Sequence, residues 1–167
     1  LNIISSKFQL NNLIFRNIKS DAIDVDFGNG LISNSSFEEI GNDAIDFSGS
    51  VSSLSNINLI NIGDKSVSIG ESSKIKISNL EILNSFIGFA VKDGSKVKLN
   101  NTSIKNGNYG IALYQKKNEY DKKNEILLND VEIIDVKNEF LTNEHSIIEN
   151  KKELNINVQK NNKIIEA

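Results

Sequence analysis

Two short acidic motifs, separated by one fixed step, are the first features of this sequence that could do chemistry. Residues 21–24 read Asp-Ala-Ile-Asp, and residues 43–46 repeat these four letters 22 positions later. Side chains alternate between the two faces of an extended strand, so Asp24 and Asp46 would each point away from the isoleucine before them. Carboxylates gathered on one face can work as general acids or bases, hold a hard cation such as Ca²⁺, or pair with lysines.

The outward polar side chains of these segments and of the matching positions downstream form one candidate site. Its candidate catalytic residues, for acid and base work, are Asp21, Asp43, Asp46, Lys65 and Lys92. Its candidate substrate-binding residues are Asp24, Asp26, Ser48, Ser68, Lys92 and Tyr114. Because stacked carboxylates repel one another unless a cation, a lysine or a raised pKa relieves them, a Ca²⁺ ion is a candidate cofactor, with ligands Asp24, Asp26 and Asp46. Neutralisation of the acidic patch by its lysines, with no cofactor, is the alternative.

A repeat of about 22 residues must position these side chains. Two apolar series run through the chain at this step, namely Ile23, Ile45, Val67, Phe89 and Ile111, and Val25, Phe47, Ile69, Val91 and Leu113. Within each unit, apolar and polar residues alternate as they do in strands. One unit cannot bury its apolar face alone, but stacked units can, because each strand pairs with its equivalent one coil away. The sequence therefore predicts an all-β fold, a parallel β-helix (β-solenoid) of about seven coils with about 22 residues per coil.

Polar residues recur at the same spacing of about 22 residues and indicate the corners at which the chain turns. The recurring corner residues are Asn12, Asn34, Asn56, Asn79, Asn101 and Asn129, and in a second series Asn17, Glu39, Asn61, Asn84, Asn106 and Asp135. Asparagine tolerates turn conformations, and amides stacked at the coil spacing can hydrogen-bond into a ladder. A leucine-rich-repeat horseshoe is the alternative fold because its period overlaps, but the other half of each unit shows no helical pattern.

We expect one β-helix domain over residues 1–167, as an excerpt of a longer chain that carries a neighbouring domain. The repeat is interrupted at residues 115–125, since Asn101 and Asn129 are 28 positions apart. This charged segment is predicted to be a loop inserted at one corner, which is either simply solvated or part of a binding face. Residues 147–167 are expected to form a C-terminal strand and a charged tail.

Composition excludes several classes of partner. The net charge is −3, so there is no basic footprint for nucleic acid. No apolar run approaches 18 residues, which argues against membrane insertion. There is no cysteine and no P-loop, GxGxxG or HExxH motif. The lone His145 has no partner in the repeated motifs and is interpreted as a surface residue.

The coil pattern and the asparagine corners of residues 6–146 resemble the right-handed parallel β-helices of the pectin-lyase-like superfamily. The resemblance implies a single-stranded right-handed parallel β-helix. The segment 63–72, Gly-Asp-Lys-Ser-Val-Ser-Ile-Gly-Glu-Ser, also looks like coils found in large bacterial surface proteins.

A more specific resemblance is to the polygalacturonase-type glycoside hydrolases, whose successive coils carry NTDGID, GDDCIAI and GHGISIGS. Residues 19–24, 41–47 and 64–71 stand in the same register as KSDAID, GNDAIDF and DKSVSIGE. This match implies that Asp21 and Asp43 occupy two of that family's three carboxylate positions. The third position, the expected proton donor, is Asn42 in this chain, and the histidine position is Lys65.

Three functions are consistent with these features. The first is an extracellular or cell-surface module that interacts with a polysaccharide, with or without catalysis, because small residues beside the acids leave the polar face flat and open. The second is a carbohydrate-active enzyme of the lyase or epimerase type that uses the Asp and Lys cluster. The third is a structural spacer or adhesin rod within a larger chain.

Overall fold

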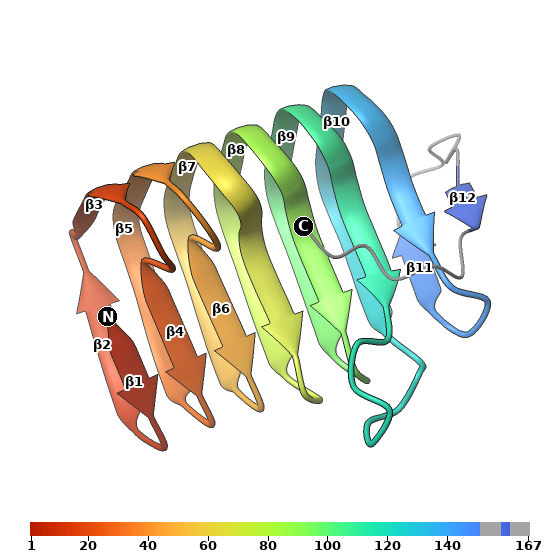
Figure 1. Cartoon of the computed structure of the whole chain (residues 1–167), viewed down its shortest axis with the longest axis horizontal. Coiled ribbons are helices and arrows are strands. Elements are labelled where there is room, and N and C mark those ends of the chain that lie inside the picture. The colour runs from red at the N-terminus through yellow and green to blue at the C-terminus, as the bar shows by residue number, and fades with distance from the viewer. Residues whose placement is uncertain (151–157, 161–167) are drawn as a thin grey trace.

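A stack of β coils makes up this protein, as the computed structural model of residues 1–150 and 158–160 shows (Figure 1). The described residues contain no helix. The strands are β1 (Asn2–Ile4), β2 (Lys7–Asn11), β3 (Ile14–Ile18), β4 (Ile23–Asp26), β5 (Asn29–Ile40), β6 (Ile45–Ser48), β7 (Val51–Gly70), β8 (Lys74–Lys92), β9 (Lys96–Tyr114), β10 (Glu125–Thr142), β11 (Ile147–Asn150) and β12 (Val158–Lys160). Within the described ranges, therefore, no helix is present of the kind that could cross a membrane.

The strand register confirms the predicted fold class. Every pairing is parallel, and each strand pairs with its equivalent one coil away. Ile23 lies opposite Ile45, and Ile45 lies opposite Val67, so one coil takes 22 residues. The chain is an all-β solenoid of about seven turns with about 22 residues per turn. The horseshoe alternative is wrong, because it would require helices between the strands.

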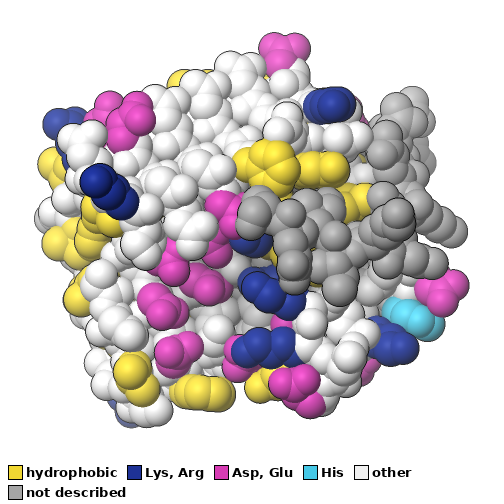
Figure 2. Space-filling model, viewed as in Figure 1, with side chains coloured by type: hydrophobic (Ala, Val, Ile, Leu, Met, Phe, Trp, Pro, Cys, Tyr) yellow, Lys and Arg dark blue, Asp and Glu magenta, His cyan; other side chains and the backbone are white. Residues whose placement is uncertain are grey.

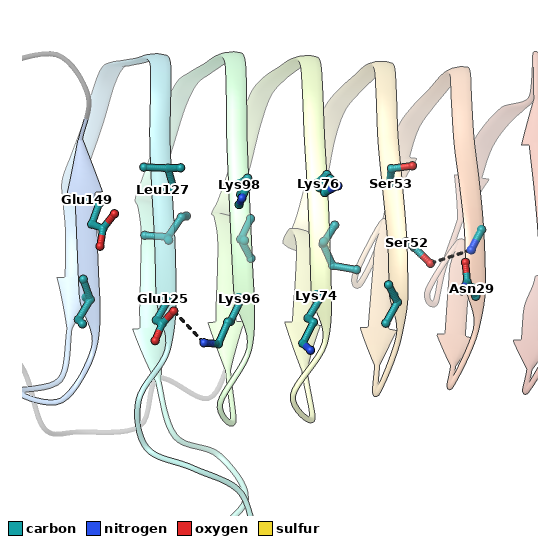
Figure 3. Close-up of a pocket in the computed structure, with 16 residues that line it drawn as sticks. Asn29, Ser52, Ser53, Lys74, Lys76, Lys96, Lys98, Glu125, Leu127 and Glu149 are labelled. Atoms are coloured by element: carbon teal, nitrogen blue, oxygen red, sulfur yellow. Dashed lines mark hydrogen bonds and ion pairs between the residues drawn. The ribbon is translucent and has the colours of Figure 1, made fainter.

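The coils build three faces. The first, here called the Asp face, is made by β1, β4 and β6 and by the C-terminal parts of β7 to β10, and it faces the viewer in Figures 1 and 2. The second, here called the Lys face, is made by β2, the first residues of β5 and β7 to β10, and β11 (Figure 3). The third face is made by β3 and the middle parts of the long strands.

The interior is apolar along its whole length. The predicted series from Ile23 to Ile111 and from Val25 to Leu113 are completely buried. Near the N-terminal end, the rings of Phe15 and Phe37 stack with their centroids 5.0 Å apart. Burial of these columns supplies the stability that a single coil lacks, at roughly 25 cal/mol for each Å² of apolar surface removed from water.

The corners between the Lys face and the third face confirm the asparagine ladder. The Asn56 amide donates to Asn34 at 2.9 Å, and the Asn79 amide donates to Asn56 at 3.0 Å. These residues have φ near +55°, a conformation that asparagine tolerates better than most residues. The prediction is wrong at one position, because Asp130, rather than Asn129, has the positive φ, and Asn129 pairs with Asn100. The inserted segment therefore shifts the register by one residue more than the sequence spacing indicated.

A second ladder, which was not predicted, lies at the corner between the Asp face and the Lys face. The Ser73 hydroxyl accepts the Ser50 backbone N–H at 2.9 Å, and the Ser95 hydroxyl accepts the Ser73 backbone N–H at 3.2 Å. Asn124 continues the series, since its side-chain oxygen accepts the Ser95 backbone N–H at 3.2 Å and its own backbone N–H donates to the Ser146 hydroxyl at 3.3 Å. Ser50, Ser73, Ser95 and Asn124 are completely buried. These side chains satisfy backbone donors that would otherwise be buried without a partner.

The C-terminal predictions are tested in part. Residues 147–150 and 158–160 form β11 and β12, and the rest of the predicted segment 147–167 lies outside the described residues. His145 is on the surface, as expected, and lies 3.4 Å from the Glu144 carboxylate.

Candidate functional site

The predicted site residues lie in columns on the Asp face. Asp24 is opposite Asp46, and Asp46 is opposite Ser68, so one outward column runs through these three side chains. The neighbouring column brings Asp26 opposite Ser48. Farther along the same face, Lys92 lies opposite Tyr114. The register thus confirms that the predicted residues share one face, where acidic and basic side chains gather next to each other (Figure 2).

Asp21 and Asp43 have a structural role that the sequence did not reveal. The Asp21 Oδ1 atom accepts the backbone N–H of Asp43 at 3.0 Å and the Asn42 amide at 2.7 Å. One coil later, the Asp43 Oδ1 atom accepts the backbone N–H of Lys65 at 3.1 Å. Each carboxylate therefore fixes the backbone at the start of the Asp-face strand in the next coil. Any catalytic or binding role of these residues would come in addition to this structural role.

Asp43 is also part of a buried charge network. The Lys65 ammonium lies 3.4 Å from Asp43 Oδ1 and donates to Asp64 on its other side. Burial raises the pKa of Asp43 to about 6, against the opposing charge of Lys65. Burial alone would lower the pKa of Lys65, but the hydrogen bond to Asp64 and the charge of Asp43 outweigh it and raise that pKa. Asp64 was not among the predicted site residues, although its place directly before Lys65 was visible in the sequence.

Lys92 is the most unusual group on this face. Its ammonium donates to the Ser68 hydroxyl at 2.7 Å, and its side chain is buried. Among the described residues it forms no ion pair with a carboxylate. Burial lowers the pKa of Lys92, against the attraction of Asp46 and Asp43. The Lys92 side chain lies over Gly70, with its Cε atom 3.5 Å from where a Cβ atom of residue 70 would be, which is an ordinary contact distance.

The carboxylates at the N-terminal end of the Asp face have few partners that offset their negative charge. The Asp46 Oδ1 atom is buried and has no hydrogen-bond partner in the described part of the chain. The pKa of Asp24 is raised by burial and, in addition, by the charges of Asp26, Asp46 and Asp21. In residues 1–150, no three acidic or histidine side chains converge closely enough to hold a metal ion. The calcium site predicted at Asp24, Asp26 and Asp46 therefore has no preformed geometry.

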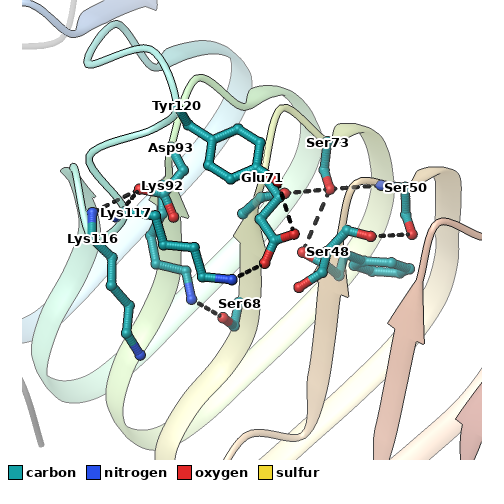
Figure 4. A network of polar contacts seen from close by, with 12 residues as sticks. Ser48, Ser50, Ser68, Glu71, Ser73, Lys92, Asp93, Lys116, Lys117 and Tyr120 are labelled. Carbon is teal, nitrogen blue, oxygen red and sulfur yellow. Dashed lines mark hydrogen bonds and ion pairs between the residues drawn. The ribbon is translucent and has the colours of Figure 1, made fainter.

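The inserted segment is anchored beside this site. The Asp93 Oδ1 atom accepts the backbone N–H groups of Lys116 and Lys117 at 2.7 and 2.8 Å. The Lys117 ammonium and the Tyr120 hydroxyl both donate to Glu71 (Figure 4). Burial alone would raise the pKa of Glu71, but these hydrogen bonds outweigh it and lower that pKa. The predicted loop is thus fixed at one corner of the Asp face and is not simply solvated; it covers residues 115–124 rather than 115–125, because Glu125 already belongs to β10.

Comparison with known proteins agrees with this geometry. The family described as right handed beta helix region matches residues 3–162 of the chain. This chain is a right-handed β-helix protein. No curated protein matches the β-helix protein. Family membership establishes the fold and its repeat, and the fold is consistent with modules that act on or bind polysaccharides.

The chemistry available on the Asp face of this β-helix protein is that of acids and bases. The face carries a carboxyl group, Asp43, that titrates near neutral pH and an amine, Lys92, that is easier to deprotonate than a free lysine. Groups whose pKa values are moved toward neutrality by burial are typical of functional sites. Tyr114, which lies next to Lys92, stays protonated, because burial raises its pKa. It can therefore donate a hydrogen bond to a ligand on this face.

Proposed function

We propose that this β-helix protein is an extracellular or cell-surface module that binds an extended polysaccharide along the Asp face. The supporting observation is the unused hydrogen-bonding capacity around Ser68. On one side of Ser68 lies Asp46, whose buried Oδ1 atom has no partner in the described residues. On the other side lies the Lys92 ammonium, which has three donors, one of them given to Ser68.

A sugar polymer fits these requirements. Its hydroxyl groups can accept from Lys92 and, once the half-buried Asp46 side chain rotates outward, donate to the Asp46 carboxylate. The columns repeat about every 4.8 Å along the stack, so a linear ligand could make the same kind of contact on successive coils. Small molecules generally prefer a concave pocket, which an open row of side chains does not provide.

Binding can be tested on an array of immobilised glycans. We expect wild type to bind at least one polysaccharide, and Asp46→Ala to weaken that binding by about tenfold or more, because a hydrogen bond to a charged group is lost. Glu81→Ala is the matched control, since it removes an exposed carboxylate from the third face. Binding that is equal in all three proteins would refute the proposal, and silence from all three would favour the structural rod.

A second candidate function is a carbohydrate-active enzyme of the lyase or epimerase type. The observation that favours it is the combination of Lys92, with its lowered pKa, and Asp43, with a pKa of about 6, on one face. In a lyase reaction on a uronate, the neutral Lys92 amine would accept the C5 proton as the bond from C4 to the leaving oxygen breaks. A carboxylic acid nearby would return a proton to that oxygen.

The lyase reaction forms a conjugated double bond that absorbs ultraviolet light. We expect absorbance to rise when wild type is mixed with a uronate polymer and to stay flat with Lys92→Gln. The rate should rise with pH as the amine loses its proton and fall as the carboxylic acid loses its own, so the pH dependence should be bell-shaped. A flat trace for wild type with all uronate polymers tried would reject the lyase function and would leave the binding proposal intact.

A further inference from the structure

The Lys face carries a second concentration of charge, separate from the site described above. Four exposed lysines occupy two neighbouring coils, with Lys74 opposite Lys96 and Lys76 opposite Lys98 (Figure 3). They line a groove of about 620 Å³. The backbones of partners one coil apart lie about 4.8 Å from each other, and the Cα atoms of the two lysines on one strand are about 6.6 Å apart. The four lysines therefore project from a compact grid of backbone positions.

The charge of this grid is only partly neutralised, because two glutamates, Glu125 and Glu149, also line the groove. Glu125 lies 3.0 Å from the Lys96 ammonium, but it also lies 3.0 Å from Lys123. The other three lysines of the grid form no ion pair within residues 1–150. Like charges placed directly opposite each other on neighbouring strands destabilise a sheet. The grid is thus an unfavourable arrangement that an anionic ligand would relieve.

The surroundings of the grid add apolar contact surface. On the N-terminal side of the grid lies Val51, opposite Lys74 and 52 % exposed. On the C-terminal side lie Leu127, opposite Lys98, and Ile147, which is 37 % exposed. Aliphatic side chains of this kind can pack against the apolar faces of sugar rings while the lysines meet the charged groups.

The composition of the groove favours an acidic polysaccharide over a nucleic acid as its ligand. Proteins that bind single-stranded nucleic acid combine a basic groove with aromatic side chains on which bases stack. The residues that line this groove include no aromatic side chain. The net charge of −3 gives no wider basic footprint.

We propose that the groove around Lys74, Lys76, Lys96 and Lys98 is a binding site for an acidic polysaccharide, whose carboxylate or sulfate groups pair with these lysines. This site goes beyond the proposed function, because it lies on a different face and selects its ligand by negative charge, whereas the proposed binding on the Asp face depends on sugar hydroxyl groups. A chain bound here would run across neighbouring coils, from the apolar surface at Val51 toward Leu127.

The test measures binding of the whole chain to three probes at low salt, namely heparin as a sulfated polymer, polygalacturonate as a carboxylated polymer, and dextran as an uncharged polymer. The test variant is Lys76→Gln with Lys98→Gln. The control variant, Lys105→Gln with Lys137→Gln, removes the same charge from exposed positions outside the groove. Both variants keep the fold because all four side chains are exposed, and circular dichroism melts check this.

We expect wild type to bind heparin or polygalacturonate, and the test variant to bind the same polymer about 25-fold more weakly, at about fivefold for each lost charge. The control variant should bind within about threefold of wild type, and binding should weaken as salt is added. The test variant should also melt at the same or a higher temperature than wild type, because it relieves the repulsion between Lys76 and Lys98.

Equal loss of affinity in both variants, or no binding of either acidic polymer by wild type, would overturn the proposal. Tighter binding of an unstructured oligonucleotide than of both acidic polymers would assign the groove to nucleic acid instead and would overturn it as well. The Asp46→Ala variant, measured in parallel, keeps the two faces distinguishable. If the Lys face acts alone, this variant binds acidic polymers like wild type, whatever the glycan array shows for the Asp face.

Discussion

Replacing Asp43 by asparagine should change how the stability of this β-helix protein depends on pH. The residue Asp43 is only 5 % exposed, and the pKa of its carboxyl, about 6, lies above the ordinary value of 3.8 that holds in the unfolded chain. A carboxyl of this kind holds its proton more tightly in the folded state. Its contribution to stability is therefore fully present below pH 3.8 and is lost as the pH rises through 6.

The size of the effect follows from the two pKa values. The interval between 3.8 and about 6, at about 1.4 kcal/mol for each pH unit, corresponds to about 3 kcal/mol in the free energy of unfolding. Asparagine keeps an oxygen that can accept the backbone N–H of Lys65 but does not ionise. The Lys65 ammonium keeps Asp64 as its partner. As the pH is raised from 3.5 to 7.5, the free energy of unfolding of Asp43→Asn should therefore increase by about 3 kcal/mol relative to that of wild type.

Denaturant titrations followed by circular dichroism at these two pH values measure this difference directly. Glu81→Gln is the control, because it neutralises an exposed carboxylate on the third face, and its difference from wild type should change little with pH. If the difference between Asp43→Asn and wild type is the same at both pH values, burial does not control this carboxyl. If wild type instead becomes more stable relative to the variant above pH 6, the ion pair with Lys65 outweighs the effect of burial, and the reasoning is wrong.

Three further predictions concern the fold and the inserted loop. Ile45→Asp should unfold the stack by placing an unpaired charge in the core, whereas Asp46→Ala should melt at the wild-type temperature or slightly above it; similar melts for both would contradict the assignment of inner and outer faces. Asn79→Ala should lose about 2–3 kcal/mol in a denaturant titration, because alanine lacks the ladder hydrogen bonds and is strained at positive φ; a loss below about 1 kcal/mol would mean that the ladder contributes little. Asp93→Ala should release the loop 115–124, so limited proteolysis should cut there faster than in wild type, and an unchanged cutting rate would show that the other contacts suffice.

The repeat was predictable because its signal depends on spacing alone. Residues such as Ile23 and Ile45 recur at one step and alternate with polar residues, and this pattern is sufficient to define columns, faces and corners. The prediction from spacing was wrong where the length of the repeat changes. The inserted segment moved the left-handed corner from Asn129 to Asp130, and a single sequence offers no internal standard for such a shift.

The site was predictable only as a set of neighbours. The sequence brought Asp46, Ser68 and Lys92 to one face, as the register confirms, but it did not show which of them would be buried. Burial is the main cause of the shifted pKa values of Lys92 and Asp43. The burial of a side chain depends on how it packs against its neighbours, as Lys92 does against Gly70, and residue spacing does not reveal this packing. Hydrogen bonds from carboxylates to the backbone, as at Asp21, are likewise invisible in residue spacing.

The uniform pairing distance has a kinetic consequence. Since almost every strand partner lies 22 or 23 residues away, each new coil closes a loop of the same length on a surface that is already formed. The entropy lost in loop closure is then nearly constant from one step to the next, with the 29-residue step across the insertion only slightly larger. Folding should therefore require one slow nucleus of adjacent turns, followed by rapid zipping in either direction.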